Sequence, residues 1–84
     1  MDAMTDLGNL LAVIHGDGGQ YLEEHGQAKA CADAEALVST DRADLRACAL
    51  ALRDVARCLT RRQVDALVSA ALARPGVVAA MEKP

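Results

Sequence analysis

Apolar positions along the chain repeat at the three- and four-residue spacing that is typical of amphipathic helices. The pattern predicts four helices, at about residues 6–15, 20–39, 41–58 and 61–73, followed by a tail over 75–84. Residues that favour strands are few. We therefore expect an all-α fold, a compact bundle of about four short helices forming a single domain over residues 1–84.

The third predicted helix has the clearest pattern. Its apolar residues repeat at 3-4-3-4 spacing and are Leu45, Cys48, Leu52, Val55 and Leu59. This spacing is typical of helices that pack against antiparallel or coiled partners. We expect this helix to contribute a continuous seam to the core.

Local signals set the expected helix ends. Thr5 is a good N-cap for the first helix, and Gly16 is a natural C-terminal stop. Residues 60–63 form a capping-box pattern that starts the fourth helix. Residues 74–76 should end that helix, because proline has no backbone N–H to donate and glycine readily adopts the conformation that follows a helix end. Gly26 is a weak point within the second predicted helix.

Two segments leave alternatives open. A strand over residues 11–14, with a hairpin turn at Asp17 and Gly18, is the alternative to the first helix. An isolated hairpin is marginal and no later strand extends it, so we favour the helix. The tail after residue 76 either docks as a last turn or frays.

The composition predicts a small core. Eighteen alanines and eleven leucines stand beside one tyrosine, with no phenylalanine and no tryptophan. A chain of this kind often gains stability by self-association, which predicts a homodimer. Residues 1–40 carry seven acidic residues and one lysine, whereas residues 41–84 carry eight basic and five acidic residues. The two halves can attract one another within the fold or across a dimer.

The chain lacks the signals of membrane or secreted proteins. No segment approaches the roughly 18 to 20 consecutive apolar residues that a membrane helix needs, and the acidic start does not resemble a signal peptide. The cysteines are odd in number and form no C-x-x-C pair; they are Cys31, Cys48 and Cys58. Reduced, half-buried thiols in a cytoplasmic protein are the expectation.

Residues 14–26 hold four of the six glycines, both histidines and the only aromatic side chain. Five residues of metal-ligating types lie in this stretch: His15, Asp17, Glu23, Glu24 and His25. Imidazole and carboxylate groups suit zinc or another divalent ion, but this spacing matches no compact site. We expect the histidines to cap helix ends, and we predict neither a metal nor a cofactor.

The glycines of residues 16–19 precede a predicted helix, as in loops whose backbone amides hold a phosphate. Both the Walker pattern and the dinucleotide fingerprint are absent, and Asp17 would repel a phosphate. We interpret the segment as a connection between helices. A nucleophilic site needs a base and an orienting partner beside its Cys or Ser, and the cysteines occupy core-like positions. We therefore do not expect an enzyme.

Four arginines fall within roughly 60° of arc on the third predicted helix. They are Arg42, Arg46, Arg53 and Arg57. One interpretation is a protein interface beside Leu50, since arginine with an apolar neighbour is typical of binding hot spots. The interpretation we favour is a solvated face that pairs with Asp54 or with the acids of residues 1–40.

A nucleic-acid surface is an alternative role for these arginines, together with Arg61 and Arg62. The net charge of −3 and the lack of an aromatic stacking platform argue against it.

One stretch has a family resemblance. Val13–Gly19, then Tyr21, residues 24–26 and residues 29–30 resemble a motif in small uncharacterised proteins of phages and prophages. The resemblance covers about residues 11–36, and Gln20 stands where related sequences often carry a histidine. It implies a phage-encoded accessory protein. Products of that kind frequently bind and inhibit a host protein, and anti-CRISPR inhibitors are among them.

We therefore expect a protein-binding module that acts on a host protein by covering its surface, in the cytoplasm of the bacterial host and without catalysis. The first candidate contact surface consists of His15, Asp17, Gln20, Tyr21 and His25. The four arginines of the third predicted helix are the second candidate. A nucleic-acid-associated protein and a metal-binding protein at the histidines are the alternatives.

Overall fold

Six helices make up the part of the chain that the computed structural model describes, residues 2–17 and 20–82. They are α1 (Ala3–Asp17), α2 (Gln20–His25), α3 (Gln27–Leu37), α4 (Ala43–Val55), α5 (Arg61–Leu72) and α6 (Pro75–Glu82). Within these ranges there is no strand, which confirms the all-α class. The expected number of about four helices was wrong, because the predicted helix over residues 20–39 is two helices and the predicted tail forms a helix of its own.

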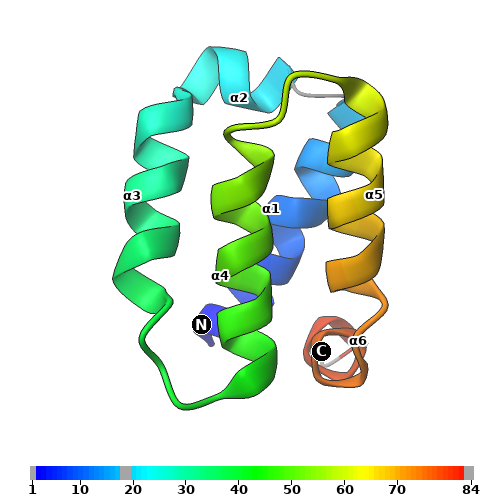
Figure 1. Cartoon of the computed structure of the whole chain (residues 1–84). Helices are drawn as coiled ribbons and strands as arrows, with labels where there is room; N and C mark the ends of the chain where they lie inside the picture. The colour runs from blue at the N-terminus through cyan, green and yellow to red at the C-terminus, as the bar shows by residue number, and fades with distance from the viewer. Residues whose placement is uncertain (1, 18–19, 83–84) are drawn as a thin grey trace.

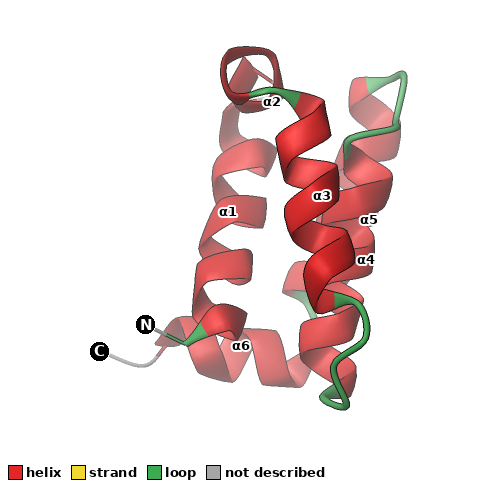
Figure 2. Ribbon diagram, turned by 90° about the vertical axis from the view of Figure 1, so that its left-hand side faces the viewer, coloured by secondary structure: helices red, strands yellow, loops and turns green. Residues whose placement is uncertain are grey.

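Helix α4 lies at the centre of the bundle (Figure 1). It packs against α3 on one side and α5 on the other, with α1 behind them and α6 across one end. Helices α1 and α3, as far as the structure describes them, do not pack against each other, and α2 connects their ends (Figure 2). The radius of gyration of 11.6 Å is that of a compact domain of this length.

The core is apolar and comes mainly from four helices. Its largest fully buried side chains are Met4, Leu11, Ile14, Cys48, Leu52, Val55, Val68 and Val77. The predicted seam of α4 is buried except at its last member, Leu59, which is 94% exposed. Helix α4 ends at Val55, where a tight turn follows because Cys58 N donates to Val55 O at 3.1 Å. The seam therefore stops one turn earlier than the periodicity predicts.

The predicted helix over residues 20–39 is two helices. Gly26 separates α2 from α3 with a φ of +86°, a left-handed conformation that only glycine adopts without strain. Its N–H donates to Leu22 O at 2.8 Å, which closes the end of α2. Helix α3 then continues in a new direction as far as Leu37.

Helix α1 is longer at both ends than expected. It begins at Ala3 rather than after Thr5, and the Asp2 carboxylate accepts from Met4 N at 3.4 Å. Thr5 is not a cap, and its hydroxyl donates instead to Ala80 O at 3.3 Å. Gly16 does not stop the helix, which continues to Asp17. The strand alternative for residues 11–14 is wrong, and Gly18 and Gly19 of the expected loop lie outside the described residues.

The capping box at the start of α5 is confirmed. Thr60 Oγ1 accepts from Gln63 N, and Gln63 Oε1 accepts from Thr60 N, each at 3.2 Å. Pro75 ends α5 as expected, but it also begins α6, since the first position of a helix tolerates proline. The tail docks rather than frays up to Glu82; its last two residues lie outside the described part.

Glycine allows α6 to approach closely. A Cβ atom at Gly76 would overlap the carboxylate of Asp44, at the start of α4. The same carboxylate accepts from Arg74 Nε at 2.8 Å. On the other side of α6, a Cβ at Gly8 would lie 3.0 Å from Cγ of Met81. These contacts hold α6 across the end of the bundle.

Within the described ranges, none of the helices taken singly has both the length and the apolar character to cross a membrane. Helices α5 and α6 reach that length and character only as a pair, and their axes are bent by 77° at the break.

Candidate functional site

The five residues of the first predicted contact surface lie at one end of the bundle but face different ways. His15 and Asp17 belong to the last turn of α1, while Gln20, Tyr21 and His25 belong to α2. The His15 ring lies against α5, whereas Tyr21 and His25 lie against the space between α1 and α3. The structure therefore does not bring the five together as one surface.

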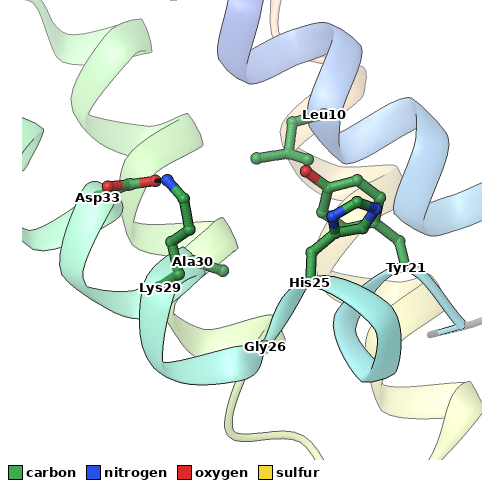
Figure 3. A pocket seen from close by; sticks show the side chains of 7 residues that line it. All are labelled: Leu10, Tyr21, His25, Gly26, Lys29, Ala30 and Asp33. Atoms are coloured by element: carbon green, nitrogen blue, oxygen red, sulfur yellow. Dashed lines mark hydrogen bonds and ion pairs between the residues drawn. The ribbon is translucent and has the colours of Figure 1, made fainter.

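Tyr21 and His25 form a stacked pair on α2 (Figure 3). Their ring centroids are 4.3 Å apart and the ring planes differ by 30°. The i,i+4 spacing places both rings on one face of this short helix. Tyr21 is half-buried and His25 is exposed, so one edge of the stack faces the solvent.

A small hollow lies beside this pair, where α1 and α3 diverge. Leu10 of α1 and Ala30 of α3 provide its apolar walls, and an ion pair between Lys29 Nζ and Asp33 Oδ2, 3.1 Å long, lies across from the rings (Figure 3). The hollow measures about 70 Å³, whereas ligand pockets generally measure roughly 300 to 1,000 Å³. It therefore suits one protein side chain rather than a metabolite or cofactor. We call Tyr21, His25 and this hollow the α2 corner.

Lys29 and Asp33, which line the hollow, pair with each other, and further acidic residues lie elsewhere on α2 and at the end of α1. Gln20 Nε2 donates to Glu24 Oε1 at 3.1 Å on the outer face of α2. Glu23 and Asp17 are also exposed at this end of the molecule. An apolar, aromatic centre with acidic residues at the same end of the bundle can bind a complementary surface, but it offers no nucleophile held by a base.

His15 joins α1 to α5. Its carbonyl oxygen accepts from Arg61 Nη2 at 2.7 Å, which satisfies one of the free carbonyls at the end of α1. Its Nε2 atom lies 3.5 Å from Ser69 Oγ and 3.7 Å from Asp65 Oδ1. A Ser-His-Asp relay needs its serine and aspartate on different ring nitrogens, and here both lie at the same one. We conclude that this cluster is structural.

The histidine-rich stretch does not gather metal ligands. Among the described residues, no group of three or more His, Cys, Asp or Glu side chains is placed to hold a metal ion.

The arginine stripe is interrupted. Arg42 precedes α4 and Arg57 follows it, so only two of the four arginines lie on the predicted helical arc. Arg42 pairs with Asp2 at 3.5 Å and Arg57 pairs with Glu35 at 3.3 Å.

These two pairs join the basic second half of the chain to the acids of residues 1–40, as the charge asymmetry predicts. Arg53 Nε lies 3.9 Å from Asp54 Oδ1. Arg46 has no acidic partner among the described residues. Apart from Arg46, the arginines of this stripe are therefore already close to acidic side chains.

The three cysteines are free thiols. Burial, followed by the nearby Asp44 carboxylate, raises the pKa of Cys48 to about 11. Burial and the Asp54 carboxylate raise the pKa of Cys58. Cys48 and Cys58 therefore remain protonated near neutral pH, a state in which a thiol is a poor nucleophile.

One surface was missed at the sequence level. A groove of about 300 Å³ lies between α4 and α5 and is lined mainly by alanine and leucine. Leu67 of α5 is only half-buried in this groove. The sequence contained one signal of this groove. Leu50 is apolar, lies beside the arginines and does not belong to the buried seam of α4.

Comparison with known proteins adds no family: no family model matches the chain, and no curated protein or solved structure matches it. Ideas about function therefore depend on the geometry of the described residues and on the resemblance of residues 11–36.

Proposed function

We propose that this chain is a protein-binding module that acts by covering part of a partner's surface, with the α2 corner as its recognition surface. In keeping with the resemblance of residues 11–36, the partner is a host protein and the module is a phage or prophage accessory protein. An inhibitor of the anti-CRISPR kind is one such protein. The module works in the cytoplasm of the bacterial host.

The observation that carries the proposal is the stacked Tyr21–His25 pair beside a hollow of single-side-chain size. Tyrosine is enriched among the residues that dominate binding energy at protein interfaces. A ring that is already held by stacking loses less conformational freedom on binding than a free one. The corner is thus prepared for contact before a partner arrives.

The charges around the corner indicate the chemistry of the partner. Residues 1–40 have a net charge of −6, and the exposed Asp17, Glu23 and Glu24 lie at this end of the bundle. A complementary partner surface is basic and presents one apolar side chain to the hollow. The nucleic-acid alternative has less support, because acidic corners repel phosphates and Arg42 and Arg57 are paired within the chain.

A capture experiment from host lysate tests the proposal. The immobilised wild-type chain should retain a stoichiometric partner, and the His25→Ala variant should lose it while keeping the wild-type melting temperature. Tyr21 also packs against the core, so Tyr21→Ala should lose the partner and remain folded with a lower melting temperature. Val78→Ala is the matched control, because it shortens an exposed apolar side chain on α6, at the other end of the bundle. Retention of the partner by both corner variants, or recovery of no partner by the wild type, would contradict the proposal.

A further inference from the structure

The groove between α4 and α5 is apolar along its length. Its apolar walls are formed by Ala47, Leu50, Ala51, Leu67, Ala70 and Ala71. Leu50 and Leu67 are half-buried, and Ala70 is exposed. Helix α1 lies behind α4 and α5 in Figure 1 and contributes no residue to the groove. The short alanine side chains allow another helix to approach closely, while the two leucines offer larger contacts.

Opposite charges lie at the two ends of this groove. Helices α4 and α5 are antiparallel (Figure 1), so the end of α4 and the end of α5 are at opposite ends of the bundle. Asp54 is exposed near the end of α4, and Arg74 follows the end of α5. Asp44 holds Arg74 there through its Nε atom, at 2.8 Å.

We propose that the groove binds the same groove of a second copy of this chain, so that the protein is a two-fold symmetric dimer. In a symmetric dimer every contact occurs twice with the roles exchanged. Antiparallel packing of the two grooves places Asp54 of each copy opposite Arg74 of the other.

A second copy fits the groove because its own charges complete the match. Asp54 makes one end of the groove acidic. At the other end Asp44 engages only Nε of Arg74, so the two Nη groups can bind Asp54 of a second copy, and the surface is complementary to itself after a half-turn. The chain is also short and poor in large side chains, and burial of Leu50 and Leu67 adds apolar area that the monomer leaves accessible. The α2 corner lies on other helices, so dimer formation leaves it free. The dimer proposal and the proposed recognition surface can therefore each be wrong without the other.

Charge exchange at Asp54 and Arg74 tests this arrangement, with sedimentation velocity measured over a series of protein concentrations. The wild type should dimerise. Asp54→Arg alone and Arg74→Glu alone should each weaken the dimer, since like charges then face each other at both ends. An equimolar mixture of the two variants should form a heterodimer with nearly the dissociation constant of the wild-type dimer, because both facing pairs are again opposite in charge.

A second variant tests the centre of the groove and keeps the result independent of the Asp44–Arg74 pair. Ala70→Arg places a long charged side chain on an exposed groove position and should raise the dimer dissociation constant at least about tenfold. Ala32→Arg is the matched control, because Ala32 is exposed on α3, which does not line the groove. The proposal is overturned by a monomeric wild type or by a dimer that Ala70→Arg does not weaken. It is also overturned if the mixture of Asp54→Arg and Arg74→Glu associates no more tightly than either variant alone.

Discussion

Gly76 and Gly16 show how differently two glycines of one chain are constrained. Each lies within a helix, where glycine costs stability relative to alanine. A Cβ atom at Gly76 would overlap the Asp44 carboxylate, whereas a Cβ at Gly16 would meet nothing within 4 Å. Only the first glycine is required by packing, and only the structure distinguishes them.

We expect Gly76→Ala to lower the free energy of unfolding by about 1 to 3 kcal/mol, because α6 must move away from α4 or Asp44 must leave Arg74. Gly16→Ala, the matched control, should leave stability unchanged or raise it by up to about 1 kcal/mol. Urea denaturation of both variants measures the difference. Equal effects would show that α6 does not dock through Gly76.

Cys48 gives the stability of the fold a dependence on alkaline pH. Its pKa is about 11 in the folded chain against an ordinary value of 9.0, because burial disfavours the thiolate. Above the ordinary value the unfolded chain loses this proton first, so stability falls as the pH rises toward 11.

The difference in unfolding free energy between wild type and Cys48→Ala should therefore shrink or reverse as the pH rises through that range. The other ionisable groups are the same in both chains, which removes their contribution from the comparison. Denaturation curves of both chains at several alkaline pH values measure this difference in unfolding free energy. A difference that stays constant would contradict the burial of a neutral thiol.

At the scale of elements, periodicity located the helical segments but not all their ends. The capping box at Thr60 carries its partners within four residues, so its structure could be predicted. Gly16 and Gly26 give the same local signal, yet α1 continues through the first and the chain turns at the second. That outcome depends on how α2 packs against α1 and α3, which short-range patterns do not contain. The end of α4 before Leu59 accompanies the tight turn in which Cys58 N donates to Val55 O.

Gly26→Ala tests the break between α2 and α3. A φ of +86° strains any residue with a Cβ, so we expect a loss of about 1 kcal/mol in stability. The new side chain has open space around it, so the loss reports backbone strain and not a clash. Gly26→Asn should lose about as much, because a ψ of +125° lies outside the left-handed helical region that asparagine tolerates. An unchanged stability in Gly26→Ala would show that the break is not needed.

At the scale of the whole molecule, the charge asymmetry of the sequence predicted contacts that the structure contains. Asp2 and Glu35 from the acidic half pair with Arg42 and Arg57 from the basic half. The candidate site was predicted less well, because Tyr21 and His25 belong to one surface and His15 to another. Sequence proximity could not show that the last turn of α1 presents His15 to α5. The groove of α4 and α5 likewise depends on which helices are neighbours.

The most direct test of the account measures how strongly the recovered partner binds to the α2 corner. A double-variant cycle by calorimetry compares wild type, Tyr21→Ala, His25→Ala and the double variant. Tyr21→Ala should weaken binding at least about tenfold, and the double variant should lose less than the two single losses combined, because the stacked rings act as one unit. Wild-type affinity in both single variants would contradict the α2 corner as the recognition surface.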